Sequence, residues 1–507
     1  MRNRSAIALM ANKLLDKLKA LTKYDLWYYY DPQQYEEETK LLKEICTQAI
    51  TEIATVWQES PDIKTWLKER ATQHDNEYVR GAAVKELAQK FKDDPDTKTW
   101  LKECATQHEN SNVRGTAVQV LGWNFKDDSD IKTWLKERAT QDEKPNVRGA
   151  AVEELGWHFK DDPDIKTWLK ERATQDYHED VRRLAVQVLG WNFKDDSDIK
   201  TWLKERATQD YHEDVRYIAV RLLAHHFKDD LDTKTWLKER ATEDENSNVR
   251  RVAIQELAKN FKNDHDTKIW LKERATQDDH WFVRGAAVEG LGWNFKDDPD
   301  TKTWLKECAT QDYHEDVRGV AVQQLAQNFK DDPDTKSILK EHATQDDHWF
   351  VRRAAVQQLA QNFKDDPDTK SILKEHATQD DNYYVRSAAV QELAQNFKDD
   401  PDTKSILKER ATQDDNYYVR GAAVQELAKH FKYQPELFDI YYNCAVDDSF
   451  ERKKKDEPNP RRIALEIIIK QFPQHSQTLP LLRDRAKNDP DEQVREFAQK
   501  KLKQLEG

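Results

Sequence analysis

Residues Val79 to Leu87 read Val-Arg-Gly-Ala-Ala-Val-Lys-Glu-Leu, and the frame Val-Arg-x-x-Ala-Val-x-x-Leu returns along the chain. Its Val-Arg dipeptide occurs in eleven consecutive copies, 34 residues apart and without insertion. Such a period indicates a repeat architecture, in which each unit packs only on its neighbours. Repetition therefore overrides the three or four globular domains that 507 residues would suggest. The arginines of the dipeptide are Arg80, Arg114, Arg148, Arg182, Arg216, Arg250, Arg284, Arg318, Arg352, Arg386 and Arg420.

Each unit is predicted to be a pair of helices. Asp94-Pro95-Asp96 supplies an N-cap acid and a first-turn proline, so we expect the first helix over residues 97–107. After a polar link, apolar residues at helical spacing predict the second helix over residues 113–126. The apolar residues on its one face are Val113, Val118, Leu121 and Phe125.

The ends of the chain depart from the repeat, as terminal units must when one of their faces has no neighbour. We expect a helical N-terminal cap over residues 1–60, eleven regular repeats over 61–434 and two degenerate capping repeats over 435–507. In the cap, Trp57 falls in the register of Phe91. The predicted fold is all-α, a right-handed α-α superhelix of about thirteen helix pairs.

The repeated residues resemble one family of helical repeats. Tetratricopeptide and pentatricopeptide repeats share the period of 34 but place their Trp, Gly and Tyr differently, whereas Val-Arg-x-x-Ala-Val-x-x-Leu resembles the second helix of HEAT repeats. The resemblance implies that the eleven Val-Arg arginines form a structural ladder, each paired with an acid in the preceding loop. The wording Asp-Asp-Pro-Asp-Thr-Lys-x-x-Leu-Lys-Glu-Arg-Ala-Thr looks like the HEAT arrays of cyanobacterial NACHT-type signalling ATPases, which implies a sensor arm. No G-x-x-x-x-G-K-[ST] loop is present to hold a nucleotide.

Composition narrows the class of partner. The formal net charge of -14 argues against generic nucleic-acid binding, which needs a basic stripe. No apolar run is long enough for a membrane span or a secretory signal. The four cysteines are far apart and lack metal-ligand spacing, which favours a reduced, cytoplasmic protein.

Positions that vary between units indicate where a partner would bind. Counting from the Val of Val-Arg as zero, positions 2, 6 and 10 lie opposite the buried face of the second helix. Aromatic and basic residues gather there in the central units and suit an acidic peptide or a partner's helix. Packing of the tryptophans on one another, or a solvated charged face, is the alternative. This concave patch consists of Trp123, Trp157, Arg183, Trp191, Tyr217, Arg221, His225, Arg251, Lys259 and Trp293.

The loops between the two helices of a unit form a second candidate surface. Trp281, Trp349, Tyr383 and Tyr417 are either recognition aromatics or rings tucked beneath the next unit. Histidines recur in the same loops, but neighbouring helices lie roughly 8 to 10 Å apart, too far for equivalent histidines to share a zinc ion. We therefore expect no metal and no cofactor. The histidines are His178, His212, His280, His314 and His348.

The sequence predicts a protein that is not an enzyme, because no catalytic signature is present and the repeated Asp-Asp-Pro-Asp carboxylates are explained by helix capping. The leading hypothesis is a protein-binding scaffold or sensor array. The alternatives are a lyase acting on bilin chromophores of phycobiliproteins, which is similar in fold only, and an accessory arm of a NACHT-type ATPase. The sequence does not decide the partner, the pathway or the oligomeric state.

Overall fold

The computed structural model describes residues 2–22, 32–74, 76–262, 264–454 and 457–506. These residues form α-helices and one short 3-10 helix, with no strand among them. None of the described helices combines the length and the apolar character that crossing a bilayer requires. The chain divides into two compact units, residues 1–260 and 261–507.

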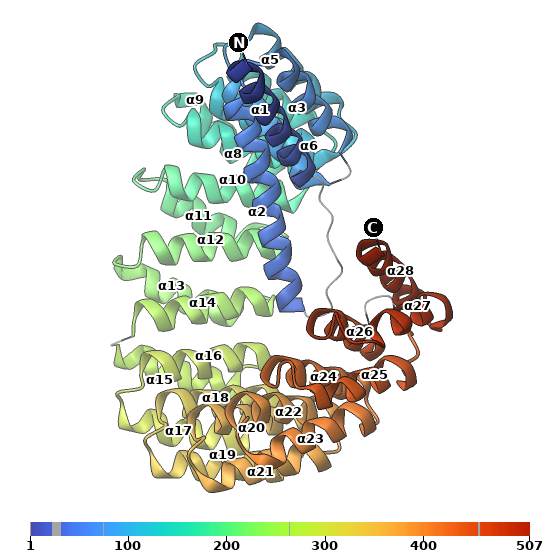
Figure 1. Ribbon diagram of the computed structural model, residues 1–507. Helices are drawn as coiled ribbons and strands as arrows, with labels where there is room; N and C mark the ends of the chain where they lie inside the picture. Colours follow the sequence, from blue (N-terminus) through green and yellow to red (C-terminus); the bar gives the residue numbers. More distant parts are fainter. Residues whose placement is uncertain (1, 23–31, 75, 263, 455–456, 507) are drawn as a thin grey trace. The chain divides into compact units, whose positions relative to one another are not determined.

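Helices alternate along the chain between two kinds, which we call helix A (odd numbers from α3) and helix B (even numbers from α4) (Figure 1). The A helices are α3 (Pro61–Gln73), α5 (Pro95–Gln107), α7 (Ile131–Gln141), α9 (Pro163–Gln175), α11 (Ile199–Gln209), α13 (Leu231–Glu243), α15 (His265–Gln277), α17 (Pro299–Gln311), α19 (Pro333–Gln345), α21 (Pro367–Gln379), α23 (Pro401–Gln413), α25 (Phe438–Asp447, after the 3-10 helix Pro435–Leu437) and α27 (Thr478–Asn488). The B helices are α4 (Glu77–Lys90), α6 (Ser111–Asn124), α8 (Pro145–His158), α10 (Glu179–Asn192), α12 (Glu213–His226), α14 (Ser247–Asn260), α16 (Trp281–Asn294), α18 (Glu315–Asn328), α20 (Trp349–Asn362), α22 (Tyr383–Asn396), α24 (Tyr417–His430), α26 (Pro460–Gln471) and α28 (Glu492–Glu506).

Helix A begins where its capping residues place it. The Asp94 side chain accepts the backbone N–H of Asp96 at 3.0 Å, and Pro95 occupies the first turn, where its missing N–H costs no hydrogen bond. The helix therefore starts at Pro95, two residues before the predicted start. The Asp-Pro signature has the predicted capping role.

Helix B lies two residues earlier than predicted. The Asn110 side chain accepts the N–H groups of Asn112 and Val113 and starts α6 at Ser111. At the other end, Phe125 leaves helical geometry while its N–H still bonds the carbonyl of Leu121. An aromatic C-cap of this kind ends most of the B helices, and the polar residues that follow lead into the next helix A.

Every helix A packs on the helix B that follows it, and inside each of the two compact units each helix B also packs on the next helix B. The predicted apolar face is buried, and Val120 and Gly122 on the same helix are buried too. A helix B inside the stack has neighbours on three sides, so its buried face is wider than a two-helix pattern predicts. The predicted all-α solenoid is confirmed.

The first two helices precede the regular repeats. Helix α2 (Pro32–Val56) packs on α4 as one helix B packs on the next, and α1 (Arg2–Leu21) packs on α2. The N–H of Trp57 bonds the carbonyl of Ile53, just as Phe91 bonds Leu87 one period later. The register assigned to Trp57 from the sequence is therefore correct, and α2 takes the place of a helix B.

Candidate functional site

The concave patch lies on consecutive B helices of the first unit. Trp123 on α6, Trp157 on α8 and Trp191 on α10 expose 65%, 48% and 43% of their surface. Arg221, His225 and Lys259 continue the row as exposed residues of α12 and α14, whereas Arg183, Tyr217 and Arg251 are half-buried. Trp293, on α16 of the second unit, is 52% exposed. The structure thus brings nine of the ten patch residues onto adjacent helices of one unit.

The patch tryptophans contact histidines of the following repeat. The Trp123 ring meets His158 edge-on, with ring centroids 4.9 Å apart. Trp191 touches both His225 and His226, at 5.1 and 4.6 Å. Each of these indoles is therefore held on one side and open on the other, which is how an interface anchor is kept in place before binding.

Glycines beside the tryptophans let successive B helices approach. A Cβ on Gly156 would lie 1.9 Å from Cγ1 of Val188, and one on Gly190 would lie 2.6 Å from Cδ1 of Leu222. Any larger residue would push the next helix B away. Close helix packing thus accounts for the glycines and leaves the neighbouring tryptophans outside the contact.

The electrostatic balance of the patch favours positive charge. Burial raises the pKa of Glu153, against the opposing effect of Arg183, and raises the pKa of Glu154 to about 8. At neutral pH Glu154 is therefore mostly uncharged. Burial thus weakens two acids beside a patch that itself carries Arg183, Arg221, Arg251 and Lys259, so its own side chains are basic within a protein of net charge -14.

Glu154 also belongs to a row of polar residues that the sequence reasoning missed. It lies under Gly122, and its Oε2 is 3.2 Å from Nε2 of His158, whose pKa is lowered by burial. The equivalent position is buried and polar in several other repeats, and apolar in others such as those of Val188 and Leu222. Examples of the polar residues are Glu86, Glu256, Gln324, Gln358 and Glu392. Comparing units at that position, seven residues after Val, would have revealed the row.

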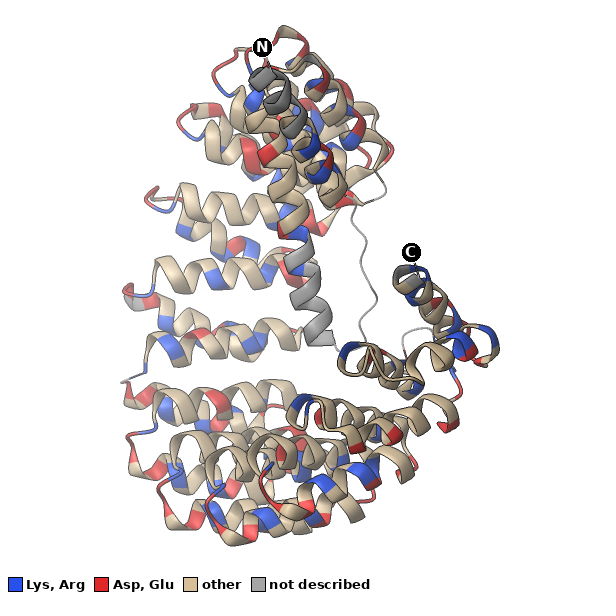
Figure 2. Ribbon diagram, viewed as in Figure 1, with Lys and Arg blue, Asp and Glu red and all other residues tan. Residues whose placement is uncertain are grey.

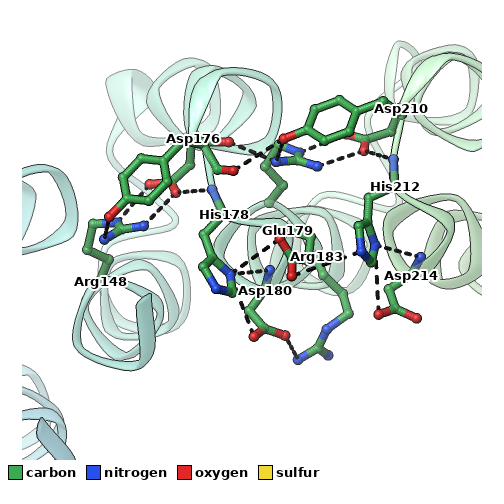
Figure 3. Close-up of polar contacts among 12 residues, drawn as sticks. Arg148, Asp176, His178, Glu179, Asp180, Arg183, Asp210, His212 and Asp214 are labelled. Atoms are coloured by element: carbon green, nitrogen blue, oxygen red, sulfur yellow. Dashed lines mark hydrogen bonds and ion pairs between the residues drawn. The ribbon is translucent and has the colours of Figure 1, made fainter. Parts of the chain in front are cut away.

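The structural ladder ties each repeat to the next (Figure 3). Arg182 is fully buried, and its Nε and one terminal nitrogen donate to the two carboxylate oxygens of Asp210 at 3.0 Å each. Its other terminal nitrogen donates to the backbone carbonyl of Asp176 at 2.9 Å. Asp210 also accepts the backbone N–H of His212 and so stabilises its own loop.

The partner acid of the ladder differs from the expectation in one respect. The resemblance implied an acid in the loop before the arginine, but that loop supplies only backbone carbonyls. The carboxylate comes from the next repeat, 28 residues later, as in Arg148–Asp176. The arginine thus joins two consecutive loops, because its five donors can serve a carbonyl and a carboxylate together.

Tyrosines cover part of the ladder. The Tyr211 ring lies over the Arg182 guanidinium at 4.0 Å, and its hydroxyl donates to the carbonyl of Tyr177 at 3.2 Å. The rings of Tyr177 and Tyr313 lie over the guanidinium groups of Arg148 and Arg284 in the same way. Such cation–π contacts shield the buried ion pairs from water.

A second ladder runs between consecutive A helices. Lys98 contacts Asp128 and Asp130 of the next repeat at 2.7 and 2.6 Å, and Lys102 contacts Asp130 at 2.6 Å. These lysines lower the pKa of Asp130 to about 2. Figure 2 shows the acidic residues concentrated in the loops and the basic residues along the helices. The recurring Lys and Asp residues therefore hold the outer side of each unit together.

The loop aromatics stack on one another between repeats. Trp281 lies flat on His314 with centroids 4.9 Å apart, and Trp349 lies on Tyr384 at 4.8 Å. Tyr383 stacks on Tyr418 at 5.7 Å, and Tyr417 meets Phe450 edge-on at 4.9 Å. The sequence left two interpretations of these rings open, and the structure shows them packed on the next repeat.

The loop histidines act as N-caps. Nδ1 of His178 accepts the N–H of Asp180 at 3.2 Å, and His212 does the same for Asp214 (Figure 3). Among the described residues, donor atoms of His314, Glu315 and Asp316 lie close enough to hold a metal ion. The Nδ1 atom of His314, however, already accepts the N–H of Asp316. The donor set fits a helix cap better than a metal site.

The cysteines are all buried and reduced. Burial raises the pKa of Cys104, Cys308 and Cys444 to about 12. A thiol with so high a pKa stays protonated at neutral pH and is a poor nucleophile and metal ligand.

Comparison with known proteins gives one family and distant structural neighbours. The family of HEAT repeats matches in overlapping stretches from residues 63–139 to residues 337–428. YibA of E. coli is 19% identical, with 57% of this chain and 97% of that chain covered and a TM-score of 0.36. Kap95p, solved with RanGDP, is 14% identical over 97% of this chain and 74% of that chain, with a TM-score of 0.45.

Kap121p bound to RanGTP is 16% identical, and the match has a TM-score of 0.42. It covers 95% of this chain but only 56% of the length of Kap121p. No curated protein matches. The matched stretches span residues 63–428, well over half of the sequence. Together with helix pairs that repeat every 34 residues, they show that the chain belongs to the HEAT-repeat family.

Proposed function

We propose that the protein is a non-catalytic binding scaffold whose concave patch receives an acidic segment of a partner protein. The observation that carries the proposal is the row of Trp123, Trp157 and Trp191, exposed at the same register of adjacent B helices. A buried tryptophan anchor is a frequent source of binding energy at protein interfaces. HEAT repeats are typically scaffolds, which agrees with this role.

The charge around the row supports an acidic partner. Arg221 is exposed. Its Cζ atom lies 5.8 Å from the centre of the Tyr217 ring, and its Nε lies 4.0 Å from a carboxylate oxygen of Glu256. Such a guanidinium remains available to a carboxylate while the aromatic ring limits its freedom. The resemblance to NACHT-associated arrays suggests a cytoplasmic signalling role, which co-purification with an ATPase would support.

The repeats themselves supply neutral substitutions for a test. The register of the tryptophans is occupied by an exposed glutamine in Gln89, Gln327, Gln361 and Gln395. Trp123→Gln/Trp157→Gln/Trp191→Gln therefore removes the anchors and keeps a residue that the scaffold accepts. The matched control is Gln327→Ala/Gln361→Ala/Gln395→Ala in the second unit.

The measurement is affinity capture from native cells followed by binding of the purified partner. We expect the triple glutamine variant to bind at least about tenfold more weakly, since a tryptophan anchor contributes about 2 kcal/mol or more. Arg221→Gln should weaken binding less and flatten its dependence on salt. Unchanged affinity in the triple variant, or an equal loss of affinity in the triple variant and in the control, would contradict the proposal.

A further inference from the structure

A basic side chain near the end of helix A recurs in the second unit. It lies four residues before the ladder aspartate and reaches that carboxylate from its own helix. The pairs are His342–Asp346 at 3.2 Å, His376–Asp380 at 2.9 Å, Arg410–Asp414 at 3.5 Å and Arg485–Asp489 at 3.7 Å. Most ladder aspartates of this unit thus receive one arginine from the preceding repeat and a second basic side chain, His or Arg, from their own helix.

Helix α25 breaks this rule with Cys444. The thiol is buried and donates to the carbonyl of Ala411 at 3.4 Å. Asp448 keeps its ladder arginine, Arg420, at 2.6 and 2.8 Å, but the residue four positions earlier is a neutral thiol. The basic side chain that most repeats of this unit carry at this position is therefore replaced here, as at Cys308, by a small thiol.

A cavity of about 350 Å³ occupies the vacated space. Its lining residues follow, by 34 positions, residues 377–381, 386, 409–410 and 413–415, a set that includes Arg410 and two of its acceptors, Thr378 and Asp414. Its walls carry the carboxylates of Asp414, Asp415, Asp447 and Asp448. Of these, Asp448 is paired with Arg420, and Asp414 and Asp415 are paired with Arg386 of the preceding repeat. The C-terminal ends of α23 and α25 face it, and the carbonyl ends of helices attract cations.

The opening depends on a second substitution, Ser449. At Cys308, the other cysteine in this register of the second unit, the corresponding loop residue is Tyr313, whose ring lies 4.3 Å from the Arg284 guanidinium. Ser449 takes the place of that tyrosine and is small and exposed. Two changes that coincide in one repeat, Cys for Arg and Ser for Tyr or Asp, leave the cavity open.

We propose that this cavity binds the guanidinium group of an arginine presented by a partner segment. Arg410 shows the fit inside the same protein, since one of its terminal nitrogens donates to the carbonyl of Thr378 and contacts Asp414, both at 3.5 Å. One period later these acceptors are Thr412 and Asp448, which line the cavity. The site belongs to the second unit and does not depend on the concave patch.

Isothermal titration of the full chain with N-acetyl-arginine amide tests the proposal. N-acetyl-citrulline amide is the neutral isostere, and we expect it to bind at least tenfold more weakly. Cys444→Arg places a guanidinium in the cavity and should abolish the heat of binding, whereas Cys444→Ser and Cys308→Arg should bind as the wild type does. Equal binding of arginine and citrulline, or unaltered binding by Cys444→Arg, would overturn the site.

A second variant tests the proposal even if Cys444→Arg does not fold. Asp447 is an exposed residue of the lining, so Asp447→Asn should weaken binding of the arginine probe several-fold. Asp439→Asn, on the same helix but outside the lining, should leave it unchanged. Binding of calcium ions in place of the arginine probe, lost in Asp447→Asn, would replace the proposal by a metal site and so refute it.

Discussion

Glu154 is a carboxyl group held in a place that disfavours its charge. It is mostly buried between two B helices, and burial raises its pKa from 4.5 to about 8. A raised pKa in the folded state means that stability is greatest below pH 4.5, declines as pH rises and is lowest above pH 8. The folded protein therefore gives up stability at neutral pH to keep this acid.

We predict that Glu154→Gln stabilises the first unit at pH 8 by on the order of 1 kcal/mol and has little effect at pH 4. Gln324 and Gln358 occupy the same register, so the scaffold accepts the amide. Thermal melts at both pH values measure the effect, with Glu153→Gln, a less buried neighbour, for comparison. A gain that is the same at pH 4 and pH 8 would exclude the ionisation as its cause.

The ladder gives a sharper prediction at the residue scale. Arg182→Ala should destabilise its repeats by about 3–5 kcal/mol, because it leaves the buried carboxylate of Asp210 without its guanidinium. Removing both partners in Arg182→Ala/Asp210→Asn should cost less than the sum of the single changes. Hydrogen exchange of α10 and α12 reports the loss locally, and additive effects would show that the pair is not coupled.

At the scale of the helix, two glycine substitutions distinguish the effect of helix–helix packing on stability from that of helix propensity. Gly156→Ala should destabilise by about 1–3 kcal/mol, because the new Cβ would meet Val188. At Gly285, within α16, an added Cβ would have no neighbouring atom within 4 Å, so Gly285→Ala should stabilise by up to about 1 kcal/mol through helix propensity. Chemical denaturation of the two variants measures both signs. Similar effects in both would mean that helix approach does not constrain Gly156.

The elements were predictable from the sequence to within two residues, because capping residues and the Val-Arg frame are repeated eleven times. Residues that act across repeats were harder to predict. The partner of Arg148 is Asp176, and nothing in one unit's pattern says that the acid comes from the following loop. The exposure of Trp123 follows from helical periodicity, whereas its contact with His158 depends on how neighbouring helices pack.

At the scale of each unit, the outer Lys–Asp ladder predicts the response to acid. Lysines lower the pKa of Asp130, Asp198 and Asp232 from 3.8 to about 2. A lowered pKa means that the stabilisation is present above pH 3.8 and is lost as pH falls through 2. We expect helicity measured by circular dichroism to decline across that window. Molar salt screens these exposed pairs and should move the onset to higher pH, and an onset independent of salt would contradict this role.

The candidate binding sites were harder to predict from the sequence than the stacking of the helices. The row of tryptophans could be predicted directly, because their register lies opposite the buried face of helix B and varies between copies. The Cys444 cavity could not, since a single substitution at a repeated position looks conservative until its neighbours are placed around it. Differences between copies identify candidate positions, and packing decides which of them open a surface.

The 28-residue reach of the arginine ladder has a consequence for the history of the gene. Ladder arginines of both units find their acid at the same distance along the chain, as the pairs Arg114–Asp142 and Arg420–Asp448 show. An unequal crossover that deletes or adds one whole copy joins the arginine of one repeat to an equivalent acid of another. Such lineages could lengthen or shorten the protein in a single event without inventing a new joint.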